Sequence, residues 1–203
     1  MRLDAKTVSF AALMGGLGNA LFLLSQSLQL LPGGQVALDL SHVATFISAL
    51  YGGPLVGFIV GALVGLGPGL YFGSVAGAIG LYLPIMILGK ALTGLTAGYL
   101  TKLLAGGRIR PKLAPIIVVL SFLPECSIIV AFFRLLVPWL SAILPVVLVK
   151  AWVEIGFIAL LMGALAGNPG FTELMGRFFS INREVQDMAD GPEGPRTRRL
   201  PLA

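Results

Sequence analysis

Charged residues are scarce in this chain. Asp, Glu, Lys and Arg make up only 11% of its 203 residues, hydrophobic residues make up 57%, and the mean hydropathy is +0.94. Soluble domains carry about 25% charged residues, so the composition excludes an ordinary globular protein. A membrane span needs roughly 20 mostly apolar residues, and several segments reach that length. The sequence therefore predicts an all-α integral membrane protein.

Soft metal ligands and enzyme motifs are also lacking. Cys126 is the only cysteine and His42 the only histidine. A single cysteine excludes an intramolecular disulfide, and the two residues together are too few for a zinc or iron–sulfur site. The motifs G-x-x-x-x-G-K-[ST], G-x-S-x-G and H-E-x-x-H do not occur. We therefore expect no metal site, no cofactor and no enzymatic activity.

Long apolar runs are what the chain does contain. We expect residues 1–166 to form a six-helix transmembrane bundle, with spans at residues 8–29, 37–52, 54–67, 83–104, 114–137 and 141–166. Residues 68–82 could be an outer loop, a short re-entrant helix or part of a longer span. Pro84 fits the first turn of a helix, where its missing N–H costs nothing. We expect residues 167–203 to form a cytoplasmic interfacial segment followed by a disordered tail.

Basic residues indicate the orientation of the bundle. They lie before span one, between spans four and five, and after span six: Arg2, Lys6, Lys102, Arg108, Arg110, Lys112, Arg177, Arg183, Arg196, Arg198 and Arg199. Short cytoplasmic loops collect Lys and Arg, and these three regions share one side of a six-span topology. We therefore expect cytoplasmic termini and a prokaryotic cell membrane. The net charge of +5 then reflects topology and does not indicate nucleic-acid binding.

Small residues recur at helical spacing in two places. Gly53, Gly57, Gly61 and Gly65 form a stripe along span three, which predicts a central packing helix because such stripes let backbones approach closely. Span one carries two small faces, one with Ala11, Gly15 and Asn19 and the other with Ala12, Gly16 and Ala20. One face can pack internally while the second receives a partner protein.

Seven ionisable side chains lie within or at the edges of the spans: Asp39, His42, Lys90, Glu125, Arg134, Lys150 and Glu154. A charge at the bilayer centre costs about 2.5–3.5 kcal/mol on insertion scales, so each needs a partner or a watery cavity. Placed by topology, they line a funnel from the outer face to mid-depth. Lys150 and Glu154 share one helix face and could hold each other or a ligand. Arg134 and Glu125 point to opposite sides of span five, and Arg134 is expected to snorkel outward.

The segments LDLSHVATFISALYGGPLVGFIVGALVG (Leu38–Gly65) and GKALTGLTAGYL (Gly89–Leu100) resemble the substrate-binding S-components of energy-coupling factor (ECF) vitamin transporters. The likeness extends over residues 8–166. It implies an outward-facing pocket formed by the loop after span one and by spans four to six. It also implies partners: a membrane coupling protein and two ATPases, with a docking face on the first helix. Ala12, Gly16 and Ala20 match that face, with glycine at the middle position.

On this resemblance, we expect the chain to capture a small polar vitamin or precursor. The expected substrate-binding residues are Lys150, Glu154, Lys90, Glu125, Asp39, His42, Trp152 and Arg134. Two alternatives from other classes stay open. One is an ion-coupled secondary transporter that uses Glu125 or Glu154 as a proton carrier, and the other is a non-transporting scaffold whose charges are only internal pairs.

Overall fold

The computed structural model describes residues 5–27, 39–106 and 109–189, and within these ranges the chain is helical with no β-strand. The elements are α1 (Ala5–Ser27), α2 (His42–Gly52), α3 (Pro54–Val64), α4 (Leu66–Val75), α5 (Ile79–Ala105), α6 (Ala114–Ser121), α7 (Leu123–Ala131), the π-helix η1 (Phe132–Leu136), the 3-10 helix η2 (Pro138–Ile143), α8 (Leu144–Gly167) and α9 (Pro169–Ala189).

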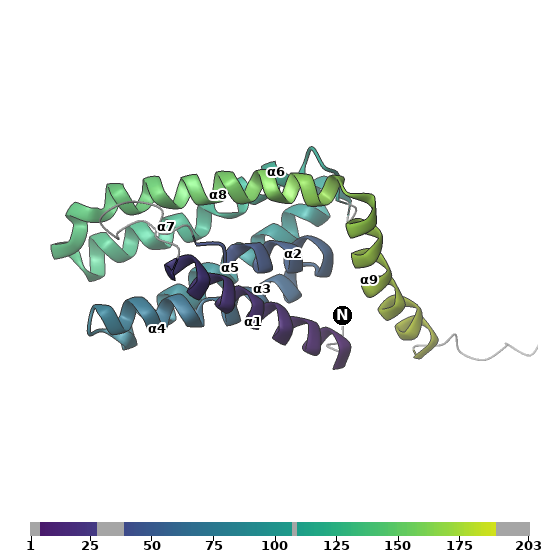
Figure 1. Cartoon of the computed structure of the whole chain (residues 1–203), viewed down its shortest axis with the longest axis horizontal. Helices are drawn as coiled ribbons and strands as arrows, with labels where there is room; N and C mark the ends of the chain where they lie inside the picture. Colours follow the sequence, from purple (N-terminus) through teal and green to yellow (C-terminus); the bar gives the residue numbers. More distant parts are fainter. Residues whose placement is uncertain (1–4, 28–38, 107–108, 190–203) are drawn as a thin grey trace, which may run out of the picture.

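Five of the described helical stretches are long and apolar enough to cross a membrane: Ala5–Gln26, Pro54–Val75, Ile79–Ala105, Ala114–Leu136 and Pro138–Gly167. The prediction of an all-α multi-pass membrane protein is confirmed in this form. The remaining expected span, residues 37–52, contains only the 11-residue helix α2. At about 1.5 Å per residue, α2 covers roughly half of a hydrocarbon core about 30 Å thick. Figure 1 shows α2 confined to one half of the bundle.

Apart from a turn at residues 76–78, residues 68–82 belong to longer helices, which decides between the three interpretations left open by the sequence. α3 and α4 follow each other through Gly65, which has α-helical dihedral angles, and together they form the span Pro54–Val75. A turn at residues 76–78 then leads into α5. The expectation for Pro84 is wrong, because Pro84 is the sixth residue of α5 and lies beyond its first turn.

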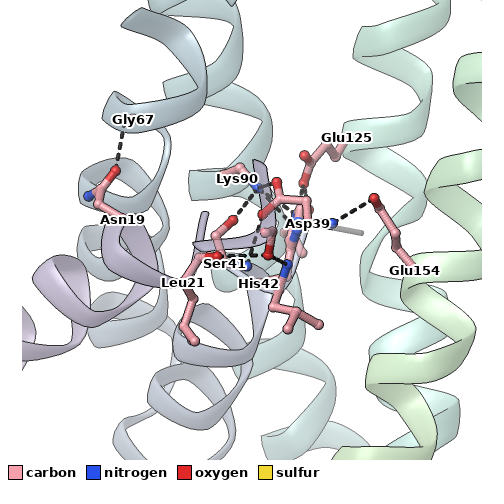
Figure 2. Close-up of polar contacts among 12 residues, drawn as sticks. Asn19, Leu21, Asp39, Ser41, His42, Gly67, Lys90, Glu125 and Glu154 are labelled. Atoms are coloured by element: carbon pink, nitrogen blue, oxygen red, sulfur yellow. Dashed lines mark hydrogen bonds and ion pairs between the residues drawn. The ribbon is translucent and has the colours of Figure 1, made fainter. Parts of the chain in front are cut away.

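The joint between α3 and α4 is built with a side chain from α1. Asn19 donates from Nδ2 to the carbonyl oxygen of Leu63 at 2.9 Å, and its Oδ1 accepts from the backbone N–H of Gly67 at 2.7 Å. In a regular helix these two backbone groups would bond to each other. The amide of Asn19 is inserted between them, as Figure 2 shows for Gly67, and so fastens α1 to the joint.

The contact between α3 and α5 is made by glycines. A Cβ added at Gly57 would lie 2.5 Å from the Gly94 carbonyl oxygen, and one added at Gly65 would lie 2.6 Å from the Ile87 Cα. At Gly61 it would collide with the carbonyl group of Lys90. The two backbones are therefore in direct contact over several turns, as expected for a helix with glycine at every fourth position.

The two small faces of α1 have different surroundings. Gly15 lies against Leu63, to whose Cβ an added Cβ would come within 2.7 Å, and Ala11 is buried. Ala12, Gly16 and Ala20 are exposed, and nothing lies within 4 Å of the position of a Cβ at Gly16. One face thus packs inside the bundle, and the other lies on its surface.

Helix α9 turns away from the end of α8 (Figure 1) and packs its aromatic residues on the bundle. The rings of Phe178 and Phe179 each lie 5.1 Å from that of Phe10, and Phe171 meets Tyr51 edge to face. The expected interfacial segment is therefore helical, with much of its apolar side against protein. The predicted tail after Ala189 lies outside the described residues.

The bundle has two distinct ends in Figure 1. One end, called the basic end below, holds the start of α1, the connection between α5 and α6, and α9. The lysines and arginines of these segments, within the described residues, are Lys6, Lys102, Arg110, Lys112, Arg177 and Arg183. The opposite end, called the far end, holds the α4–α5 turn and the connection between α7 and α8.

Candidate functional site

A cavity of about 270 Å³ lies in the half of the bundle nearer the far end. It is bounded by α4, the first half of α5, α7, η1, the first half of α8 and the segment that leads into α2. Most of its lining is apolar or aromatic. The complete lining is Asp39, His42, Pro68, Phe72, Tyr82, Ile85, Met86, Lys90, Phe122, Glu125, Ile129, Phe132, Phe133, Ile143, Val147, Lys150, Ala151, Glu154 and Ile155.

Glu125 reaches the cavity from a break in a helix. α6 ends at Ser121, and α7 begins at Leu123 with Pro124 in its first turn and Glu125 directly after it. Proline has no N–H to continue the hydrogen bonds of the preceding helix, so the helix is interrupted at this depth. Glu125 thus comes to lie in a first helical turn, where a negative charge is favoured by the helix dipole.

Lys90 is the centre of a buried polar network, shown in Figure 2. Its ammonium nitrogen lies 3.0 Å from Asp39 Oδ2, 3.0 Å from Ser41 Oγ and 3.0 Å from His42 Nδ1. An ammonium group has three protons and no acceptor. All three donors of Lys90 are therefore used by the segment that enters α2, and Lys90 fixes that segment to α5.

His42 lies between Lys90 and Glu125. Its Nδ1 and Nε2 lie 3.0 Å and 3.4 Å from Lys90 Nζ. Nε2 lies 3.0 Å from Glu125 Oε2, which also accepts from Thr93 Oγ1 at 2.6 Å. His42 thus connects the ammonium group of Lys90 on α5 to the carboxylate of Glu125 on α7.

Lys150 and Glu154 form the second part of the network. Lys150 Nζ lies 3.0 Å from Glu154 Oε1, and the same oxygen accepts from the backbone N–H of Asp39 at 2.7 Å. The two residues thus hold each other, and Glu154 also ties α8 to the start of α2. Lys150 retains 21% of its side-chain exposure, and only one of its three donors is used by a described residue.

Several polar atoms at the cavity have no partner among the residues that the structure describes. They are Oε1 of Glu125, Oε2 of Glu154 and the hydroxyl of Tyr82. The fully enclosed side-chain atoms without a partner are instead Gln26 Nε2 and Thr45 Oγ1. Among the described residues these atoms therefore have no hydrogen-bond partner, and together with the spare N–H groups of Lys150 they could contact a ligand.

Six of the eight expected substrate-binding residues line this cavity: Asp39, His42, Lys90, Glu125, Lys150 and Glu154. The other two do not. Trp152 packs its ring edge to face on Phe122 at 5.4 Å and is otherwise exposed, and Arg134 lies on the outer surface of η1. Arg134 and Glu125 point in different directions, as their nine-residue separation on one helix predicts. The loop expected to complete the pocket, residues 29–36, lies outside the described residues.

Three polar residues of the site were missed by the sequence analysis: Ser41, Thr93 and Tyr82. Thr93 follows Lys90 by three residues and so shares its helix face, and Ser41 directly precedes the first residue of α2. Both positions could have been identified from spacing. Tyr82 could not, because its place on the cavity depends on the start of α5 at Ile79 instead of residue 83.

Comparison of the chain with protein-family models, with curated proteins and with solved structures finds no match.

Proposed function

We propose that this chain is the membrane-embedded substrate-capture subunit of an ECF-type importer. In this role it binds a small polar vitamin or precursor in an outward-facing pocket and delivers it with a separate coupling protein and two ATPases. The observation that carries the proposal is the cavity, which lies in one half of the bundle and is lined by charged side chains in an apolar setting. Ligand sites are typically concave and apolar, with a few well-placed polar groups.

The orientation we propose supports capture from outside. The described basic residues outside the spans gather at the basic end, which the positive-inside tendency assigns to the cytoplasm, and the cavity lies toward the far end. We extend the proposal to six crossings of a prokaryotic cell membrane, one of them at residues 37–52, with both termini in the cytoplasm. The exposed face of Ala12, Gly16 and Ala20 would dock the coupling protein, because small residues permit close helix contact in lipid.

Native mass spectrometry of the protein released from detergent tests the capture function. We expect a bound small molecule of defined mass in the wild type and its loss in Lys150→Ala and in Glu154→Gln. The control is Glu173→Gln, which alters an exposed acid paired with Arg177 and should keep the ligand. If both cavity variants, correctly folded, bind the ligand as the wild type does, the proposal fails.

One observation favours a second candidate, an ion-coupled secondary transporter. Glu125 lines the cavity, and its only hydrogen-bond partners among the described residues, His42 and Thr93, both contact Oε2. An acid beside a cavity within the membrane is typical of a proton carrier. Uptake by such a transporter would collapse when an ionophore dissipates the proton gradient and would persist without ATPases. Import by an ECF-type complex would show the reverse dependence. A scaffold would show neither uptake nor a bound ligand.

A further inference from the structure

The joint between α3 and α4 lies directly beside the cavity, and two successive positions there lack the regular helical hydrogen bond. The amide of Asn19 takes the place of the bond from the Gly67 N–H to the Leu63 carbonyl. Pro68 has no N–H to bond to the Val64 carbonyl, and Pro68 itself lines the cavity. Helices bend where a side chain inserts into this ladder of bonds or where a proline interrupts it. The direction of α4 after the joint is therefore less constrained by its own backbone than in a regular helix.

The insertion of Asn19 depends on the absence of a side chain at position 67, because a Cβ added at Gly67 would collide with Asn19 Oδ1. Asn19 Nδ2 also donates to the Gly15 carbonyl of its own helix at 2.8 Å. The backbone of α1 lies close to α3 beside this contact, since a Cβ added at Gly18 would collide with the side chain of Val64. The Asn19 amide is thus held by three hydrogen bonds, one within α1 and two at the joint.

The segment after the joint forms a wall of the cavity. Phe72 follows Pro68 by four residues and so shares its helix face, and both residues line the cavity. Phe72 also meets α1, where the fully buried ring of Phe22 lies 5.9 Å from that of Phe72 and 5.7 Å from that of Tyr71. Phe22 follows Asn19 by three residues, so the two side chains lie on one face of α1. α1 therefore contacts this wall twice, at the joint and one turn beyond it.

We propose that Asn19 is a positioning residue for the cavity. It keeps the joint open on the side of α1 and thereby sets how far α4 leans toward α8, which lies across the cavity. Asn19 does not line the cavity, so it acts only through the α4 wall. The next residue, Ala20, belongs to the exposed face of α1, so a protein docked on that face would bear on the helix that holds the joint. Only this last step, from docking to the cavity, rests on the proposed function.

Distances between pairs of spin labels, measured by double electron–electron resonance in nanodiscs, test this role. In a Cys126→Ala background, Ser74→Cys and Val146→Cys carry the labels. Both positions are exposed, one near the end of α4 and the other near the start of α8, so their separation reports the distance between the two walls. Asn19→Leu is the main variant, because leucine has a similar size and cannot bond to either backbone group of the joint.

We expect Asn19→Leu to increase the distance between the labels. A helix bends away from the side on which its hydrogen bonds are opened. Without the amide, the two backbone groups of the joint can bond directly to each other, and α4 should tilt back toward α1. Ser74 lies about 10 Å beyond Gly67 along α4, so a change in tilt of about 20° would move it by about 3–4 Å.

Two controls separate this effect from a general loosening of the bundle. Ser25→Ala removes another side chain of α1 that bonds to a different segment, through the backbone N–H of Leu40, and should leave the distance unchanged. A second label pair, Leu55→Cys with Val146→Cys, places one label on α3 before the joint. The distance in that pair should be the same with Asn19 and with Asn19→Leu, since the glycine contacts with α5 hold α3 in place.

Gly67→Ala keeps the test decisive if Asn19→Leu does not fold, because the added methyl group excludes the Asn19 amide from the joint and should also change the distance between Ser74→Cys and Val146→Cys. An unchanged distance in the folded variant, a decrease in Asn19→Leu, or an equal change in Ser25→Ala or in the second label pair overturns the role of Asn19. The distances require no ligand. A wild type that carries no bound molecule in native mass spectrometry would therefore count against the capture function and leave the role of Asn19 standing.

Discussion

Lys90 and Lys150 differ in how many of their N–H groups are used by other described residues. Lys90 is buried and gives all three protons to residues at the start of α2, so it acts as a fixed part of the framework. Lys150 is partly exposed and uses one described contact, to Glu154. The sequence placed both lysines in a charged funnel. Only the structure separates the lysine that holds the site together from the lysine that remains available.

Replacing each lysine with methionine should therefore have unequal effects on stability. Lys90→Met leaves Asp39 without its ion-pair partner in a buried site, and removal of one partner from such a pair costs about 3–5 kcal/mol. Lys150→Met should cost less, because Glu154 keeps the backbone N–H of Asp39. The free energy of unfolding, measured in mixed micelles by titration with SDS, gives the comparison. Equal losses in the two variants would contradict the assigned roles.

The pairing of these residues could be predicted only in part. Lys150 and Glu154 are four residues apart on one helix, and their contact follows from the helical repeat. Asp39 and Lys90 are 51 residues apart, and His42 and Glu125 are 83 apart. Such pairs depend on how the helices are arranged around the cavity. The cost of a charge inside a membrane predicts that each of these residues has a partner. It does not predict which residue that partner is.

At the scale of the elements, the glycines of α3 fix the crossing with α5. The four-residue spacing predicted a close helix contact, but not the partner helix. The boundaries of α4 were not foreseen, since Gly67-Pro68-Gly69 is typical of a loop. Asn19 explains the difference. Its amide satisfies Leu63 and Gly67 across the joint, which lets the chain continue as a helix through a sequence that would otherwise end one.

Gly61→Ala should destabilise the bundle, because the new methyl group would collide with the backbone of Lys90 and Ala91. Overpacking of a tight contact costs about 1–3 kcal/mol, and this contact offers no flexible side chain that could move aside. Gly156→Ala is the matched control: Gly156 lies within α8 with nothing within 4 Å of the added methyl group. Thermal unfolding in detergent should show a lower midpoint for Gly61→Ala alone.

The two faces of α1 permit a similar comparison for docking. Gly16→Leu places a large side chain on the exposed face, so we expect normal folding and at least about a tenfold loss of affinity for the coupling protein. Gly15→Leu would collide with Leu63 and should lower stability itself. Co-purification with the coupling protein, together with a size-exclusion profile of each variant alone, separates the two effects. Normal co-purification of Gly16→Leu would argue against docking on this face.

At the scale of the whole molecule, the separation between the basic end and the cavity determines how the protein would be oriented. The two ends of the bundle can be predicted from hydropathy and charge, because these properties extend over whole segments of the sequence. The short length of α2 could not be predicted in this way, since residues 37–52 are apolar enough to suggest a full crossing. The cavity lies beside the residues that enter α2, so its shape could not be predicted from the spans.

Cysteine labelling in intact cells tests the orientation. In a Cys126→Ala background, Ser74→Cys places a thiol near the far end and Gly176→Cys places one on the exposed side of α9. A membrane-impermeant maleimide should label Ser74→Cys in intact cells, and should label Gly176→Cys only after permeabilisation. The reverse pattern would show that the basic end faces outward and would exclude capture from outside.

The glycine seam between α3 and α5 also bears on how the specificity of this protein could be altered. Where the two backbones meet, no side chain can be enlarged without moving a helix, so the backbone of α5 behaves as a fixed template. The cavity wall on α8 is made of side chains such as Val147 and Ala151, which lie away from that contact. A library directed at these side chains would therefore search for new ligands at little risk to folding, while substitutions at Gly57 or Gly61 would mostly yield unfolded protein.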